Sequence, residues 1–190
     1  MSQRNKYFIF SCKFLIIAMF KVSLGMASDK PFETFDPTKN RNWSFFTDGV
    51  MGGVSSGKAF FGKSGSDNFV RLEGIVSTAN NGGFIQIRHN LERYLDKDIK
   101  GISLKVRGNG EKYYVFIRTT STLLPWQFYH ASFKSSKNWK FVEINLKAFQ
   151  PSSSFLRKTI ISSSIKSIGI VAYGRDHDAK IDISEIYFFK

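Results

Sequence analysis

The sequence contains a single cysteine, few acidic residues and no long hydrophobic run. Cys12 is the only cysteine among 190 residues, so no disulfide can form within the chain and no cysteine-rich zinc site can be built. No stretch reaches the ~20 apolar residues that a membrane-spanning helix needs. Hydrophobic residues nevertheless make up 42% and aromatic residues 16%. The composition therefore excludes a globally disordered chain and predicts a sizeable core.

Motifs for catalysis or cofactor binding are also missing. The three histidines, His89, His130 and His177, do not have the spacing of a metal site. The glycines at 49–53 lack the Gly-Lys-Ser/Thr ending of a phosphate-binding loop. We therefore predict no catalytic residue, no cofactor and no metal, and we expect a protein that is not an enzyme. One alternative is a glycosidase pair, Glu73 with Glu143, which requires the fold to bring the two carboxylates close together.

Basic residues outnumber acidic ones by 28 to 15, which gives a net charge of +13. Residues 1–27 contribute four of these positive charges and no negative one, so residues 28–190 carry 13 − 4 = +9. The basic residues are spread over many segments, as on a solvated surface. This distribution predicts no specific nucleic-acid partner. It leaves open attraction to an acidic protein or peripheral association with an anionic membrane.

The first 27 residues have the pattern of a targeting segment. Arg4 and Lys6 precede the short apolar run 14–20, and small residues at 25 and 27 offer a cleavage site before Ser28. A secretory signal peptide and an exported or periplasmic protein are predicted. The alternatives are a mitochondrial presequence, with a matrix or inner-membrane-associated protein, and an uncleaved anchor.

Residues 28–190 are predicted to form one all-β domain. Apolar and polar residues alternate with a period of two in many short segments, and turn residues separate them. The predicted strands are 69–77, 84–88, 101–108, 112–119, 126–133, 139–146, 168–173 and 180–188, with weaker ones near Phe45 and at 59–61. Eight to ten strands at this spacing indicate a single-domain β-sandwich or jelly roll.

Two local details follow from the same pattern. The Asn-Gly pair at 109–110 predicts that 101–108 and 112–119 form a β-hairpin. Residues 155–158 are compatible with one short helical turn between serine-rich loops.

The aromatic residues leave two interpretations open. The segment from 126 to 139 is dense in them, with Trp126, Phe128, Tyr129, Phe133 and Trp139. Most aromatic side chains of a sandwich fill its core. An exposed set could instead stack on the sugar rings of a glycan.

Several blocks together resemble a known family. They are Trp43 with 48–57, Phe61-Gly62, 74–77 with 80–84, the Gly-x-x-Leu-x-Val-x-Gly-x-Gly-x-x-Tyr pattern ending at Tyr113, and 167–170. The chain resembles the NADH:ubiquinone oxidoreductase (complex I) intermediate-associated protein 30 family over about residues 35–188. The family often has Gly-Asp-Gly where this chain has Gly-Asn-Gly at 108–110.

The resemblance implies a galactose-binding-like jelly-roll sandwich and a non-enzymatic, chaperone-like role. Its mitochondrial members act as assembly factors that hold intermediates of respiratory complex I. It therefore implies protein partners, among them such intermediates, while an exported carbohydrate-binding module is the alternative. A secretory leader would carry the protein away from the site of complex I assembly.

The family's motif turns are the candidate site residues, with a structural or a partner-facing role. They are Asp48, Gly49, Met51, Gly52, Gly53, Asn80, Asn81, Gly82, Gly83 and Phe84. Gly52 and Gly83 are expected to need a positive φ. Met51 and Phe84 are the best candidates for side chains that fix the turns or face a partner.

Overall fold

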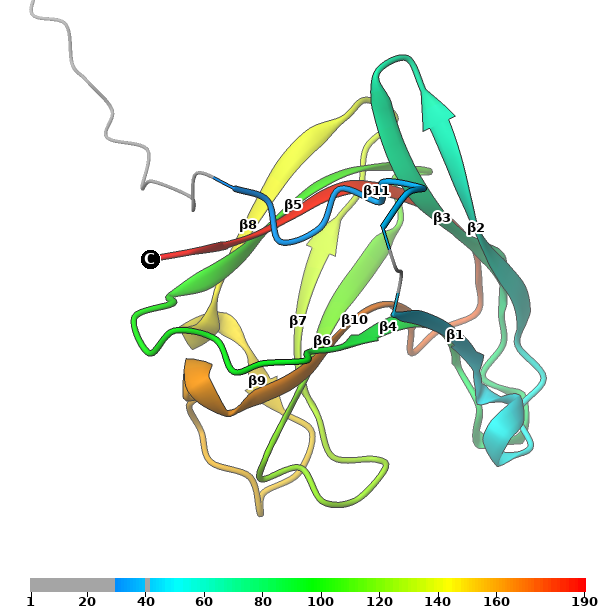
Figure 1. The fold of residues 1–190 in the computed structure, drawn as a ribbon. Coiled ribbons are helices and arrows are strands. Elements are labelled where there is room, and N and C mark those ends of the chain that lie inside the picture. Colours follow the sequence, from blue (N-terminus) through cyan, green and yellow to red (C-terminus); the bar gives the residue numbers. More distant parts are fainter. Residues whose placement is uncertain (1–29, 40–41) are drawn as a thin grey trace, which may run out of the picture.

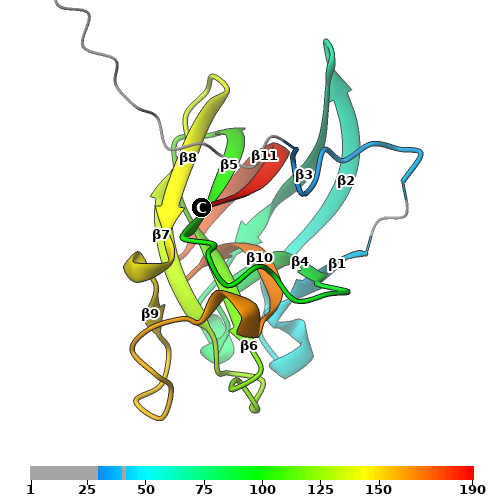
Figure 2. The same ribbon diagram turned by 60° about the vertical axis from the view of Figure 1, so that its left-hand side comes forward.

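A computed structural model describes residues 30–39 and 42–190. The predicted targeting segment and Cys12 lie outside these residues. Among the described residues, no helix is long and apolar enough to cross a membrane. The fold is all-β, as predicted, with two antiparallel sheets packed face to face (Figures 1 and 2).

The first sheet has six strands in the order β1-β4-β10-β6-β7-β9. Their bounds are β1 Trp43–Thr47, β4 Phe84–Asn90, β10 Ile165–Tyr173, β6 Lys112–Thr119, β7 Tyr129–Lys134 and β9 Gln150–Pro151. The second sheet has five strands in the order β2-β3-β11-β5-β8. Their bounds are β2 Ser56–Ser64, β3 Asp67–Val76, β11 His177–Phe189, β5 Gly101–Gly108 and β8 Lys140–Asn145.

Four single 3₁₀ turns lie between the strands among the described residues. They are η1 Asp48–Met51, η2 Ala79–Asn81, η3 Leu146–Ala148 and η4 Ser162–Ser164. The helical turn expected at 155–158 does not form, and the serine cluster at 162–164 forms η4 instead. The strand predicted from 126 begins only at Tyr129, because residues 120–128 form a loop.

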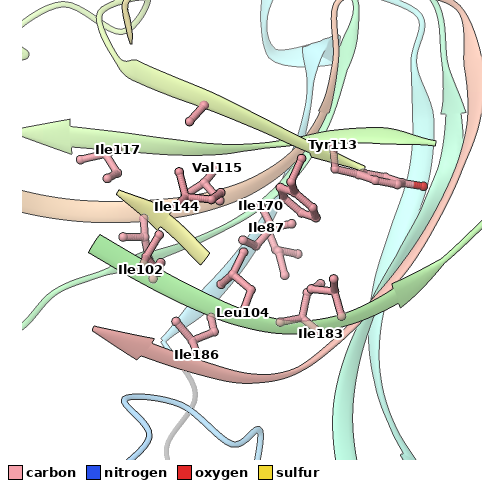
Figure 3. Close-up of a cluster of buried hydrophobic side chains, with 14 of the residues drawn as sticks. Ile87, Ile102, Leu104, Tyr113, Val115, Ile117, Ile144, Ile170, Ile183 and Ile186 are labelled. Atoms are coloured by element: carbon pink, nitrogen blue, oxygen red, sulfur yellow. The ribbon is translucent and has the colours of Figure 1, made fainter. Parts of the chain in front are cut away.

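The core lies between the sheets and is built from the alternating inward positions of both. On β5, Ile102, Leu104 and Val106 are fully buried, and on β6 the same holds for Tyr113, Val115 and Ile117. Figure 3 shows Ile102 and Leu104 of β5 packed against side chains of β6 between the layers. Each strand therefore gains its stability from apolar area removed from water on one face.

The predicted hairpin of 101–108 with 112–119 is wrong. Both strands have the predicted bounds, but β5 pairs with β11 and β8 while β6 pairs with β10 and β7. The connection crosses between the sheets. Asn109 fixes it, because its Nδ2 donates to Asp178 O at 2.7 Å and its Oδ1 accepts from Tyr113 Oη at 2.7 Å.

Candidate functional site

The predicted motif turns meet at one buried carboxylate. Asp48 begins η1 and is fully buried. Its Oδ1 accepts from Ser55 N at 3.0 Å, and its Oδ2 accepts from Ser55 Oγ at 2.5 Å, Gly83 N at 2.5 Å and Phe84 N at 3.2 Å. The carboxylate therefore ties the β1–β2 connection to the start of β4.

These hydrogen bonds set the ionisation of Asp48. Burial by itself raises the pKa of the Asp48 carboxyl, but the donors from Ser55, Gly83 and Phe84 outweigh that effect and hold the pKa below its usual value. The folded state thus favours the charged form, and this charge contributes to stability at neutral pH.

Two glycines explain why the motif is rich in this residue. A Cβ on Gly53 would lie 2.3 Å from Asp48 Cγ, which leaves no room for any side chain. Gly83 has a φ of +125°, a conformation that side chains rarely adopt, and it donates to the carboxylate.

The other motif residues surround this buried corner. Gly49 is exposed in η1, and Gly82 packs on Asp48 Oδ2. A positive φ is found at three further positions, Gly52, Asn80 and Asn81. Met51 is 63% exposed, whereas Phe84 is half-buried. Most of the motif residues therefore shape the buried corner around Asp48, whereas the Met51 side chain faces outward.

The outer face of the six-stranded sheet carries an aromatic cluster, to which the aromatic segment 126–139 contributes Phe128. The cluster consists of Tyr114, Phe116, Phe128, His130 and Tyr173. Phe116 stacks on Phe128 with ring centres 4.1 Å apart, and the Tyr173 ring meets Phe116 edge-on at 5.3 Å. Outward positions of a sheet normally carry polar side chains, so this second apolar face is unusual.

Side chains of the outer face cover the middle of the sheet. Val171 points away from the core, because its neighbours Ile170 and Ala172 point into it. In register it lies between Gln86 and Tyr114. Val171 is nevertheless fully buried, so outer-face side chains cover it.

Two arginines border the cluster. The Arg88 guanidinium lies over the Phe46 ring at 4.5 Å, and Arg118 Nη2 donates to Leu124 O at 2.9 Å. Desolvation and the positive charge of Arg118 lower the pKa of Arg88. Within the described part of the chain, neither arginine has an ion-pair partner. No outward position of the six strands holds an acidic residue.

The outer face of the five-stranded sheet is different, because its buried and half-buried charges form ion pairs. Asp182 is 3% exposed and accepts from Arg71 Nε at 2.5 Å and from Arg107 Nε at 2.8 Å. Lys105 Nζ lies 3.0 Å from both Asp67 and Glu185. The most buried charges of this face are therefore paired, whereas Arg88 and Arg118 on the other face have no ion-pair partner among the described residues, so we favour the six-stranded sheet as the binding surface.

The five aromatic residues between 126 and 139 do not all have the same role: some fill the core and others lie outside it. Tyr129 and Phe133 are buried in the core. Phe128 belongs to the outer aromatic cluster, Trp126 is 64% exposed, and Trp139 packs under the Arg107 guanidinium at 4.6 Å. Tyr129 and Phe133 are four positions apart on β7 and therefore face the core together, whereas Trp126, Phe128 and Trp139 lie outside this strand.

The structure does not assemble the carboxylate pair considered from the sequence. Glu73 lies on β3 and Glu143 on β8, three strand positions apart in the sheet order. Strand spacing alone separates them by at least about 14 Å, beyond the ~5–9.5 Å of glycosidase pairs. Within residues 30–39 and 42–190, no group of three His, Cys, Asp or Glu residues is arranged to hold a metal ion.

A cavity of about 530 Å³ lies beside the N-terminal segment, between residues 30–34 and 91–96. His89 lines it, and burial lowers the pKa of this imidazole. Lysine, arginine, glutamate and aspartate side chains all contribute to the lining, so the cavity favours no single ligand charge.

Solved structures with a similar fold include carbohydrate-binding modules and agarases. A family 11 carbohydrate-binding module from Clostridium thermocellum, in complex with a β-1,3-1,4-mixed-linked tetrasaccharide, has a TM-score of 0.69 and 15% identity over 84% of this chain and 94% of that one. The same family's module from the cellulosomal cellulase Lic26A-Cel5E has a TM-score of 0.69 and 14% identity, over 86% and 95%. The agarase AgWH50C has a TM-score of 0.58 and 10% identity, over 85% of this chain and 24% of that one. At these identities the likeness shows a shared jelly-roll sandwich.

No curated protein matches the sequence significantly. Residues 32–183 match the sequence model of the Complex I intermediate-associated protein 30 family, a range that spans both sheets, the Asp48 corner and the aromatic cluster. The chain therefore belongs to the complex I intermediate-associated protein 30 family.

Proposed function

We propose that this protein is a non-catalytic binding protein that helps assemble a protein complex, and that it binds its partner through the outer face of the six-stranded sheet. One observation carries the proposal. That face combines the aromatic cluster with two arginines that have no ion-pair partner among the described residues.

The energetics of Arg88 favour an acidic group on the partner. Its half-buried guanidinium has lost hydration and lies close enough to Arg118 to be repelled by it. A partner carboxylate would neutralise this repulsion and accept two parallel hydrogen bonds from the planar guanidinium. Aromatic and arginine side chains also dominate the binding energy of protein interfaces.

Family membership suggests that the partner is an assembly intermediate of respiratory complex I. The test is deletion of the gene and native-gel analysis of complex I, followed by complementation. Wild type and the exposed-loop control Arg93→Glu should restore normal assembly, whereas Arg88→Glu should leave a stalled intermediate. Unchanged complex I in the deletion strain would refute the assembly role.

The role in complex I assembly depends on where the predicted targeting segment, residues 1–27, delivers the protein. Assembly of complex I requires the processed protein to reach the membrane face where intermediates accumulate, yet residues 1–27 have the pattern of an export signal. N-terminal sequencing of the mature protein, combined with cell fractionation, tests this condition. Release of the mature protein outside the cell would exclude the respiratory role.

Glycan binding is the second candidate function. The aromatic cluster favours it, and the structural neighbours include a module solved with a bound tetrasaccharide. Native affinity electrophoresis in gels containing soluble polysaccharides, among them mixed-linkage β-glucan, tests it. Retardation that Tyr114→Ala abolishes would establish it, and unretarded migration in every gel would reject it.

A further inference from the structure

The loop between β6 and β7, residues 120–128, has an inverted polarity. Two of its four polar side chains, Thr122 and Gln127, are each only 8% exposed, whereas Leu123 is 82% exposed and Trp126 is 64% exposed. Surface loops normally direct polar groups to water. An apolar set held outward is the observation that needs an explanation.

Hydrogen bonds hold this loop in its inverted form. Gln127 Oε1 accepts from Leu123 N at 2.9 Å and from Leu124 N at 3.1 Å, and Arg118 Nη2 donates to Leu124 O. The buried Gln127 amide and the half-buried Arg118 guanidinium thus bond the polar backbone groups of Leu123 and Leu124. The leucine side chains are left to project into solvent.

A second apolar projection lies beside the first. In the segment 152–161, Phe155 is 92% exposed. Ser152 joins the two loops, because its N donates to Phe128 O at 2.8 Å and its Oγ donates to Trp126 O at 3.0 Å. Both loops lie at the lower end of the molecule in Figures 1 and 2. We name Leu123, Leu124, Trp126 and Phe155 the apolar tip.

The charges around the apolar tip have one sign. Residues 120–128 and 152–161 contain no acidic residue, and Arg157 and Lys158, two and three residues after Phe155, are exposed. The chain as a whole carries +13. The surroundings therefore complement a negatively charged surface.

We infer that the apolar tip docks this protein on the surface of an anionic lipid bilayer. Leucine and phenylalanine would enter the boundary between headgroups and acyl chains, and the Trp126 indole would sit at headgroup level. Arg157 and Lys158 would contact anionic headgroups. Projecting side chains flanked only by cations fit a bilayer better than a protein groove. The inference is independent of the binding proposed for the sheet face.

A fluorophore at the apolar tip tests the inference in the full chain. Because Cys12 is the only cysteine, Cys12→Ser with Leu123→Cys allows specific NBD labelling. The matched control is Phe141→Cys on β8, a 56% exposed position outside both loops. With vesicles of phosphatidylcholine and phosphatidylglycerol, the probe at 123 should shift to the blue and be quenched by nitroxide lipids, while the probe at 141 should not respond.

Substitutions then separate the apolar and the electrostatic contributions. Leu123→Ser with Trp126→Ser should weaken partitioning at least about tenfold, since burying one large apolar side chain is worth that much. Arg157→Glu with Lys158→Glu should remove the preference for anionic over neutral vesicles. An unresponsive probe at 123, or equal responses at 123 and 141, would overturn the inference. The inference would also be overturned if the wild-type protein did not bind vesicles while Leu123→Ser failed to complement the deletion strain. The loop would then serve a contact with another protein.

Discussion

The Asp48 carboxylate offers the sharpest test of how the family motif works. In Asp48→Asn the side chain keeps its shape but loses its charge, and one of its two oxygens becomes an NH₂ group. If the amide oxygen faces Gly83, Phe84 and Ser55 Oγ, the NH₂ group faces Ser55 N, and two donors then oppose each other.

The magnitude follows from the hydrogen bonds. One buried backbone donor is left without an acceptor, which costs about 1–3 kcal/mol, and three charge-assisted bonds become weaker neutral ones. The free energy of unfolding should fall by about 2–4 kcal/mol at pH 7. For a domain of this size the melting temperature should fall by roughly 5–15 °C.

The pH dependence gives an independent check. Since folding lowers the pKa of Asp48 below the usual 3.8, its stabilisation is complete above that value and is lost as the pH falls through the folded-state pKa. Urea unfolding at pH 7 and pH 3 should therefore show a smaller difference between wild type and Asp48→Asn at pH 3.

The control is Asp178→Asn, an exposed position whose side chain accepts no hydrogen bond among the described contacts. It should change stability by less than about 0.5 kcal/mol. A change below about 1 kcal/mol for Asp48→Asn at pH 7 would show that the carboxylate does not hold the corner together.

Three further substitutions test other parts of the fold, each by urea unfolding at pH 7. Gly83→Val forces a branched side chain into a φ of +125° and should cost about 2–4 kcal/mol; wild-type stability would reject the conformational role of this glycine. Asp182→Ala leaves the guanidiniums of Arg71 and Arg107 without their shared carboxylate and should cost about 2–4 kcal/mol, and an unchanged urea midpoint would mean that the three charges are independently solvated. Tyr113→Phe removes the acceptor for Lys180 N and should cost about 1–3 kcal/mol, with a loss below about 0.5 kcal/mol arguing against a fixed crossover between the sheets.

The strands were predictable because their signal is local. The alternation in 101–108 and 112–119 reflects burial of every second side chain, and both strands have the predicted bounds. Their pairing was not predictable from this signal. Two strands with one apolar face each can pair side by side or face each other across a core, and both arrangements bury the same residues.

The candidate site was predicted in part. The motif identified Asp48 and its surrounding glycines, but the carboxylate's role depends on donors from residues 83 and 84, which only the folded chain brings to it. One strand of the sequence indicates the aromatic cluster. Tyr114 and Phe116 occupy the positions opposite the core residues Tyr113 and Val115, so this strand is apolar on both faces.

The sequence alone determined the all-β class, most strand positions and the family, because periodicity, turn residues and motif spacing are properties of short segments. The tertiary structure alone decided which strands pair, where the unpaired arginines meet the aromatic rings and which loop side chains project. These features arise from contacts between residues far apart in the chain. Their free energy depends on partners that no local window of sequence contains.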